Sequence, residues 1–124
     1  MQRTEDGRGS IGPGEDEEAL AIARQDFGIT ADRALPLPGD VDRNFLLIGA
    51  DGRTPAAVLK VFTSRRGRAP LEQQRDLFDA LSSEAPDIAP LLPVMLRQAP
   101  GDDPIRAVNF AGAPLDAALY RYLP

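Results

Sequence analysis

The chain has 124 residues, of which 43% are hydrophobic and 27% charged, and its net charge is -5 at pH 7. This length and composition fit one compact domain with a packed core. Its 19 acidic residues outnumber 14 scattered basic ones, which argues against the basic stripe of a nucleic-acid-binding protein. An anionic membrane surface is disfavoured as a partner for the same reason.

The sequence contains no histidine and no cysteine. The lack of cysteine excludes disulfides, thiolate nucleophiles and cysteine zinc sites, and the lack of histidine removes the commonest general base and metal ligand. Catalysis by this chain alone would have to rest on carboxylates, lysine or arginine. No run approaches the roughly 18 apolar residues of a membrane span, and the amino terminus lacks the apolar core of a signal peptide, so we expect a cytoplasmic protein.

The first third of the chain predicts one helix between two irregular segments. Residues 1–14 are polar, Gly-rich and without periodicity, which indicates a disordered lead-in to a domain spanning 15–124. A helix is expected over 16–27, because acidic residues at its start complement the helix dipole and Gly28 is a suitable C-terminal cap. Residues 29–43 predict a short extended segment followed by a loop.

Two apolar runs predict a β-hairpin. Its strands are expected at 44–48 and 57–62, and Asp51-Gly52 between them is a strong turn dipeptide. Side chains alternate along the second strand, so one face carries Val58, Lys60 and Phe62 and the other carries Ala57, Leu59 and Val61. Because both faces are largely apolar, we expect both to be covered, with Lys60 as the exception.

The rest of the chain predicts a second helix, a second hairpin and a last strand. The helix is expected over 70–83, since Pro70 is acceptable in a first turn and apolar residues recur on one stripe. Segments 93–98 and 105–110 predict the hairpin, and 117–123 the strand. The whole order indicates an α+β fold, an antiparallel sheet of about five strands with two helices. This is the layout of a protein-kinase-like small lobe.

A short polar loop, 39–45 (GDVDRNF), lies at the start of the first hairpin strand. Loops of this kind close over nucleotide phosphates through backbone N–H groups and polar side chains. Carboxylates repel phosphates unless a metal is present, so Arg43 and Asn44 are better candidates for direct contacts than Asp40 and Asp42. The alternative is an ordinary acidic surface loop.

Lys60 is the single lysine of the chain, in the middle of an apolar run. An ammonium group is costly to bury unless it finds a partner. The position resembles the strand lysine of kinases, which pairs with nucleotide phosphates. The alternative is a solvated lysine on an edge strand, where lysine opposes aggregation. The apolar neighbours and the absence of any other lysine favour the functional interpretation.

Glu72 follows Lys60 by twelve residues, near the start of the second predicted helix. In kinases a helix glutamate pairs with the strand lysine and keeps it directed at the phosphates. Asp76 and Asp79 on the same helix are competing candidates. The alternative is a solvated helix acid, and the pairing is favoured only because Lys60 needs a partner.

These motifs together resemble the amino-terminal lobe of the aminoglycoside-phosphotransferase-like kinase superfamily, most of all its hydroxylysine-kinase-like branch. The resemblance covers 18–124 and rests on a D-x-N-F loop ending at Phe45, a V-L-K strand ending at Lys60 and an E-x-Q helix start at Glu72. The last residues, 119–124, resemble the strand that leads to the hinge between the two lobes.

The resemblance implies a function in ATP binding. Lys60 would contact the nucleotide phosphates, Glu72 would orient Lys60, and the loop with Asp42, Asn44 and Phe45 would cover the phosphates. The family's catalytic His-Gly-Asp loop has no counterpart, because the chain has no histidine. The resemblance therefore implies no catalytic or metal-binding residue in this chain, with Mg²⁺ supplied by an absent catalytic lobe, and no kinase activity for the chain alone.

Two other interpretations stay open. The first is a stand-alone interaction module that dimerises through the apolar edge 120–123, because exposed apolar patches usually mark association. Tyr122→Asp would then break the dimer. The second is an α+β domain of unrelated function whose motifs match by chance.

Overall fold

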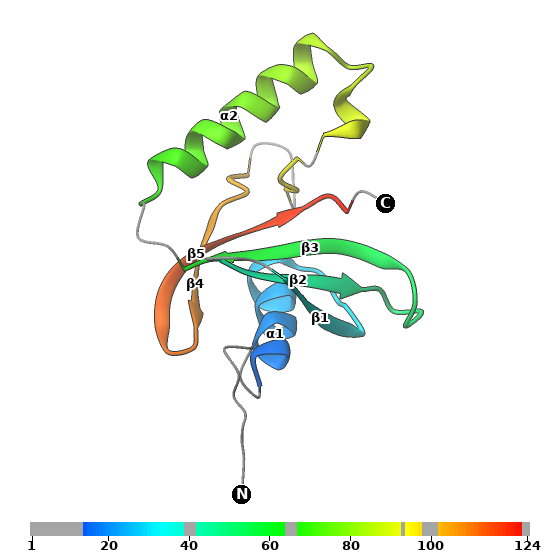
Figure 1. Cartoon of the computed structure of the whole chain (residues 1–124), viewed down its shortest axis with the longest axis vertical. Helices are drawn as coiled ribbons and strands as arrows, with labels where there is room; N and C mark the ends of the chain where they lie inside the picture. Colours follow the sequence, from blue (N-terminus) through cyan, green and yellow to red (C-terminus); the bar gives the residue numbers. More distant parts are fainter. Residues whose placement is uncertain (1–13, 39–41, 64–66, 93, 98–101, 123–124) are drawn as a thin grey trace, which may run out of the picture.

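The computed structural model describes residues 14–38, 42–63, 67–92, 94–97 and 102–122, apart from the side chain of residue 89. The expected disordered lead-in over 1–14 therefore lies outside the described residues, except for Gly14. The described residues form two α-helices and a five-stranded antiparallel sheet, which is the α+β class that the sequence predicted (Figure 1). No helix in this part of the chain is long and apolar enough to cross a membrane.

The strand order across the sheet is β1-β2-β3-β5-β4, and every neighbouring pair is antiparallel. The strands are β1 (Arg33–Leu37), β2 (Arg43–Ile48), β3 (Pro55–Phe62), β4 (Arg106–Phe110) and β5 (Ala113–Tyr120). β2 and β3 form the hairpin that the sequence predicted around Asp51-Gly52. β3 is the central strand, with β2 on one side and β5 on the other.

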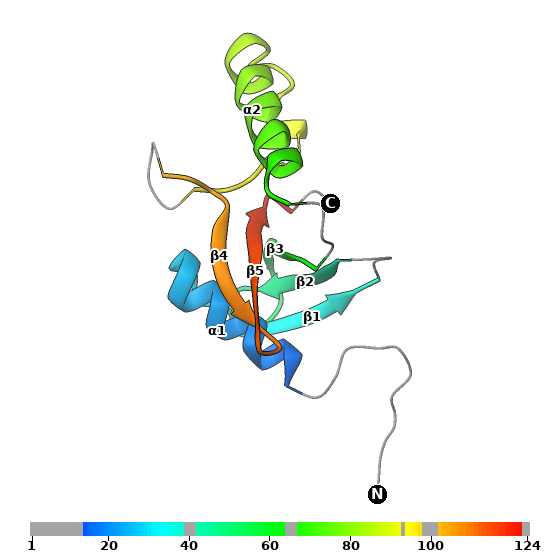
Figure 2. The same ribbon diagram turned by 90° about the vertical axis from the view of Figure 1, so that its left-hand side faces the viewer.

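The helix α1 (Glu15–Phe27) covers one face of this sheet (Figures 1 and 2). It ends where the sequence predicts, and the Gly28 N–H caps it by donating to the Arg24 carbonyl at 3.2 Å. Its buried residues are Ala19, Ile22, Ala23 and Phe27. A fully buried large apolar side chain is worth about 1.5–3 kcal/mol, so α1 is firmly packed.

The α1 face of the sheet holds the main hydrophobic core. On β3, Ala57, Leu59 and Val61 are fully buried, whereas the side chains of the opposite face are half-buried. Phe45 of β2 and Phe110 of β4 meet edge to face in this core, with ring centroids 6.0 Å apart. The sequence predicted that other elements would cover both faces of β3. In the structure only the face toward α1 is fully buried.

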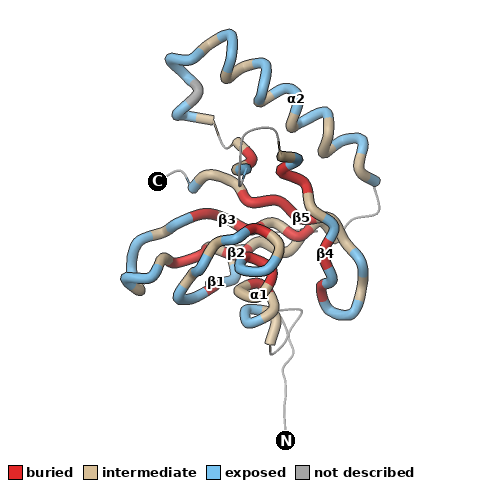
Figure 3. The backbone as a smooth tube through the Cα atoms, turned by 180° about the vertical axis from the view of Figure 1, so that it is seen from behind, coloured by how far each residue is buried: buried red, intermediate tan, exposed pale blue. Residues whose placement is uncertain are grey.

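The helix α2 (Ala69–Glu84) lies on the opposite side of the sheet from α1 (Figures 1 and 2). It matches the predicted helix over 70–83 and has Pro70 in its first turn. None of its residues is buried, and Figure 3 shows no buried segment along it. Leu71 in its first turn packs on a small apolar cluster of Met95, Ile105 and Ala118. A 3-10 helix, Ala89–Leu91, follows α2.

The second hairpin differs from the prediction. β4 pairs with β5 through Ala111-Gly112, so the predicted pairing of 93–98 with 105–110 is wrong. Both turn residues have positive φ, 52° at Ala111 and 79° at Gly112, which is the combination that a two-residue type I′ turn requires. This turn also makes the last strand begin at Ala113, earlier than the predicted start at residue 117.

The described part of the predicted strand 93–98, residues 94–97, contributes little to the sheet. Within 94–97, Met95 forms a single antiparallel bridge with Tyr120, beyond the point where the β4–β5 ladder ends at Ala117. Leu96 adds one backbone bond, its N–H donating to the Leu119 carbonyl at 2.8 Å. The segment therefore runs along the end of β5 without becoming a strand.

Candidate functional site

A hollow of about 1010 Å³ lies beside the face of the sheet that α1 leaves uncovered. Strands β2, β3 and β5 and the first turns of α2 contribute to its walls. Its lining includes Asp42, Lys60, Phe62, Leu71, Gln74 and Tyr120. The hollow is therefore formed by the face and the helix that the sequence singled out around Lys60.

Lys60 stands in the middle of β3, half-buried, and lines the hollow. Because β3 is the central strand of the five, the alternative of a solvated lysine on an edge strand is excluded. Its Nζ lies 5.7 Å from the ring centroid of Phe62, within the range of a cation–π contact. Among the described residues, none of the ion pairs involves Lys60.

Strand pairing places two residues beside Lys60 on the same face. Asn44 of β2 is its partner on one side and Ala118 of β5 on the other. Ala118 is fully buried in the small apolar cluster with Met95 and Ile105, whereas Asn44 supplies an amide. A ligand anion that reached Lys60 would therefore also approach the predicted phosphate loop.

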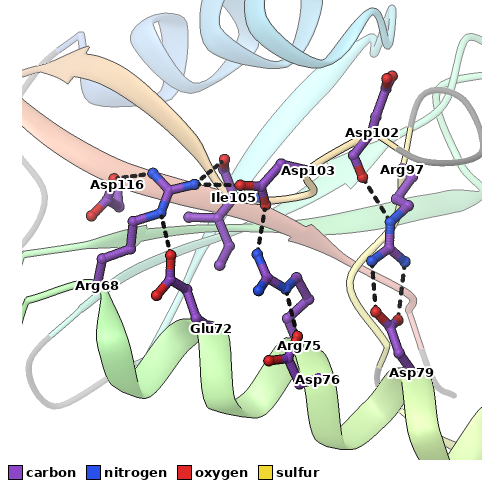
Figure 4. Close-up of polar contacts among 10 residues, drawn as sticks. All are labelled: Arg68, Glu72, Arg75, Asp76, Asp79, Arg97, Asp102, Asp103, Ile105 and Asp116. Carbon is purple, nitrogen blue, oxygen red and sulfur yellow. Dashed lines mark hydrogen bonds and ion pairs between the residues drawn. The ribbon is translucent and has the colours of Figure 1, made fainter.

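Glu72 does not pair with Lys60 in this structure. Its carboxylate lies 3.4 Å from the Nε of Arg68, the N-cap residue four positions earlier (Figure 4). The two competing candidates are also held by arginines, Asp76 by Arg75 at 3.0 Å and Asp79 by Arg97 at 2.8 Å. The expected Lys60–Glu72 ion pair is thus absent among the described residues, and the orienting role of Glu72 stays a prediction.

The predicted phosphate loop is divided between the two faces of the sheet. Residues 39–41, including Asp40, lie outside the described residues. Asp42 lines the hollow, and its Oδ1 accepts a hydrogen bond from the Thr63 N–H at 3.0 Å. Asn44 donates from Nδ2 to the Asp42 carbonyl at 3.3 Å. Asp42 and Asn44 are therefore both on the side of Lys60.

Because successive side chains of β2 point to opposite faces of the sheet, Arg43 and Phe45 lie on the α1 side. The Nε of Arg43 lies 3.5 Å from Oε1 of Glu15 at the start of α1, where both residues also border the hollow. Phe45 is fully buried against Phe110. A side chain inside the core cannot cover phosphates in the hollow, so the role expected for Phe45 is not supported; Phe45 is a core residue.

Tyr120 is a wall of the hollow that the sequence did not predict. Its hydroxyl donates to Oε1 of Gln74 at 2.6 Å and so connects the end of β5 to α2. Burial, together with the nearby Asp42 carboxylate, raises the pKa of the Tyr120 hydroxyl well above its ordinary value. Side-chain alternation along the last strand could have predicted this position, since it places Tyr120 on the same face as Ala118 and Lys60.

Arg68 is the centre of a polar network between the start of α2 and the segment before β4 (Figure 4). Its Nη2 lies 2.7 Å from Oδ2 of Asp103 and donates to the Ile105 carbonyl at 2.9 Å. Its Nη1 lies 3.4 Å from Oδ1 of Asp116 on β5. Arg75 adds a contact to the other oxygen of Asp103 at 3.3 Å. The network fixes where α2 stands beside the hollow.

The charges around the hollow limit what it can bind. Among the described residues, its lining holds three carboxylates, Glu15, Asp42 and Asp116, and two cations, Lys60 and Arg43. No three acidic side chains in the described part of the chain gather to hold a metal ion. A polyphosphate would therefore need to arrive with its charge partly neutralised by a cation of its own.

No family model, curated protein or solved structure matches the chain. The likeness to kinase small lobes therefore depends on the motifs around Lys60 and stays a prediction.

Proposed function

We propose that this chain is the ATP-binding small lobe of a small-molecule phosphotransferase of the kinase type. The observation that carries the proposal is Lys60, the single lysine of the sequence, which is half-buried in the central strand and faces a hollow without an ion-pair partner among the described residues. Such a lysine lowers stability unless it serves a ligand. A nucleotide phosphate is the ligand whose charge matches it.

Asp42 and Asn44 support the same assignment from the neighbouring strand. Asn44 lies across from Lys60 in the strand register, and Asp42 faces the same hollow. The Asn44 amide can donate to a phosphate oxygen, whereas the Asp42 carboxylate tolerates a phosphate only through a bound cation. The nucleotide is therefore Mg-ATP, with its Mg²⁺ carried by the phosphates and completed by a second lobe.

The role of the chain in phosphoryl transfer is binding and orientation. Transfer depends on a base that positions the acceptor and on metal ions that neutralise the phosphates. The chain has no histidine for the His-Gly-Asp loop of the family that it resembles. On this proposal the chain has no kinase activity alone, and a separate catalytic lobe is its partner.

A thermal-shift titration with Mg-ATP tests the proposal. A ligand that binds only the folded chain adds about 0.4 kcal/mol at a concentration equal to its Kd, which raises the Tm of a chain this small by about 2 °C. We expect this rise in the wild type and its loss in Lys60→Met, which keeps the apolar stem and removes the charge. The matched control Arg53→Gln removes an exposed charge from the β2–β3 turn and should respond like the wild type. Equal Tm rises in the wild type and Lys60→Met, or no rise in either, would reject the proposal.

A second candidate, self-association, is favoured by exposed apolar side chains on and after α2. Leu77, Ile88 and Leu91 are 56%, 42% and 71% exposed. The edge expected at 120–123 is less suitable, because Tyr120 is half-buried and bonded to Gln74, and Leu123 lies outside the described residues. A dimer mass in light scattering that Leu77→Asp reduces to the monomer would support this candidate, and a monomeric wild type would exclude it.

A further inference from the structure

The two helices are attached to the sheet in different ways. Four residues of α1 are buried in the main core, whereas no residue of α2 is buried. Leu71 in the first turn of α2 packs beside the buried Met95 and Ile105. Further along the helix, Phe78 and Leu81 are only half-buried. The rest of its docking depends on polar groups.

Those polar groups form a latch of four side chains, namely Arg68, Gln74, Arg75 and Asp79. Each reaches a group outside α2: Arg68 contacts Asp103 at 2.7 Å and Asp116 at 3.4 Å, and Arg75 contacts Asp103 at 3.3 Å (Figure 4). Gln74 accepts from Tyr120 at 2.6 Å. Asp79 takes both Nη atoms of Arg97, at 3.1 and 2.8 Å.

The latch is open to solvent. The side chains of Arg68 and Asp103 are 35% and 45% exposed, and Asp79 is 50% exposed. Ion pairs at this exposure weaken with ionic strength, because the Debye length falls from about 10 Å at 0.1 M salt to about 3 Å at 1 M. Apolar packing, such as that of α1, is not weakened in this way. High salt should therefore weaken the attachment of α2 to the rest of the chain and leave that of α1 unchanged.

The backbone before α2 suits a hinge. Gly67 has a φ of +80°, and a Cβ built on it would meet no atom of the described residues within 4 Å. A glycine in open space can change its backbone angles without a clash. The helix itself has 16 residues, close to the length at which isolated helices are only marginally stable in water. Once undocked, α2 should therefore lose helical hydrogen bonds as well as its contacts.

We propose that α2 is an electrostatically latched flap, which leaves the sheet as a unit about Gly67 while α1 and the strands stay folded. Because Leu71 and Gln74 line the hollow beside Lys60, release of the latch removes one wall of that hollow. Ionic strength, or a charged partner that competes for Arg68, thereby controls access to the hollow. The latch is a property of the chain itself and does not depend on which ligand the hollow takes.

Hydrogen exchange of the whole chain at about 0.1 M and 1 M NaCl, where the Debye length differs about threefold, tests this proposal. Exchange separates segments that open locally from those that open with the whole molecule. We expect amides of α2 to exchange at least about tenfold faster at high salt, while amides of α1 and β3 keep their rates. In Arg68→Gln, α2 should exchange fast at both salt concentrations, because Glu72, Asp103 and Asp116 then repel one another.

The matched control is Arg53→Gln, which removes one exposed arginine from the β2–β3 turn and should keep the wild-type response of α2. The salt comparison on the wild type needs no substitution, so it decides the matter even if Arg68→Gln fails to fold. Exchange of α2 in step with β3 at both salt concentrations would overturn the proposal. Fast exchange of α2 that salt leaves unchanged would overturn it too, because no electrostatic latch would then exist.

Discussion

Asp51 organises the turn between β2 and β3 through a set of local hydrogen bonds. Its carboxylate accepts from the Thr54 hydroxyl and from the N–H groups of Thr54 and Arg53, at 2.8 and 2.9 Å. These bonds, that of the Thr54 hydroxyl first, lower the pKa of Asp51 from 3.8 to about 2. Because these donors stabilise the charged form of the carboxylate, the stability of the folded chain should depend on whether Asp51 is protonated.

The pH dependence of stability follows from that shift. Because the folded state binds the proton on Asp51 less tightly than the unfolded state, its contribution is complete above the ordinary pKa of 3.8 and is lost as the pH falls toward about 2. We expect Asp51→Asn to reduce the loss of Tm between about pH 5 and pH 2. Asp87→Asn, at an exposed site in the loop after α2, is the control and should follow the wild type. Identical pH profiles for Asp51→Asn and the wild type would contradict this role of Asp51.

Lys60 and Phe45 show what the sequence could and could not provide at this scale. The apolar run around Lys60 was enough to place it on a strand, and its central position required the sheet order, which depends on distant pairing with β5. Phe45 was assigned to the phosphate loop from a motif. The pleat of β2 decides otherwise, because Phe45 is paired with Leu59 and both point into the core.

The two hairpins differ in how clearly the local sequence predicts their turns. Asp51-Gly52 is a common turn dipeptide, and β2–β3 was predicted almost to the residue. The β4–β5 turn instead uses Ala111, which holds a positive φ of 52° without the side chain that favours it. Glu18 of α1 stabilises the turn, since its carboxylate accepts from the Ala111 N–H at 3.0 Å. A tertiary contact of this kind is not visible in local sequence.

Relief of this backbone strain should stabilise the hairpin. Asn-Gly is the preferred pair for a type I′ turn, so Ala111→Asn is expected to raise the free energy of unfolding by about 0.5–1 kcal/mol. Urea unfolding measures this change in the free energy of unfolding, provided that the m-value stays the same. Ala107→Asn, at an exposed site on β4, is the control and should give no gain, because asparagine is disfavoured in strands. If Ala107→Asn raised the free energy of unfolding and Ala111→Asn did not, the left-handed conformation of Ala111 would be contradicted.

The helix α2 was predicted closely in its bounds and poorly in its contacts. Its apolar stripe indicated packing on the sheet, yet none of its residues is buried. Spacing along the chain likewise suggested Glu72 as the partner of Lys60, but Arg68 at the N-cap of α2 lies one turn away and pairs with that carboxylate. Sequence periodicity predicts which side of a helix is apolar, whereas the partners of its polar side chains depend on where Arg97, Asp103 and Ile105 lie in the fold.

For the molecule as a whole, the sheet separates two environments. The α1 face is a closed apolar core with Phe45, Leu59 and Leu119 almost completely buried. The other face has, among the described residues, only the small buried cluster of Met95, Ile105 and Ala118. It carries Lys60 beside a hollow and is overlain by α2, none of whose residues is buried. A fold that needed only stability would place an apolar residue at position 60. The asymmetry is the reason to look for a ligand on this face.

We propose that Lys60 holds nucleotide phosphates in this hollow, a claim that ¹H–¹⁵N spectra recorded during a Mg-ATP titration can decide. We predict shifts that concentrate at the amides of Asp42, Asn44, Lys60 and Thr63, and that disappear in Lys60→Met while its other resonances show an intact fold. Mg-tripolyphosphate should reproduce them, because the phosphates carry the contact. Shifts that persist in Lys60→Met, that cluster elsewhere, or that never develop in the wild type would contradict the claim.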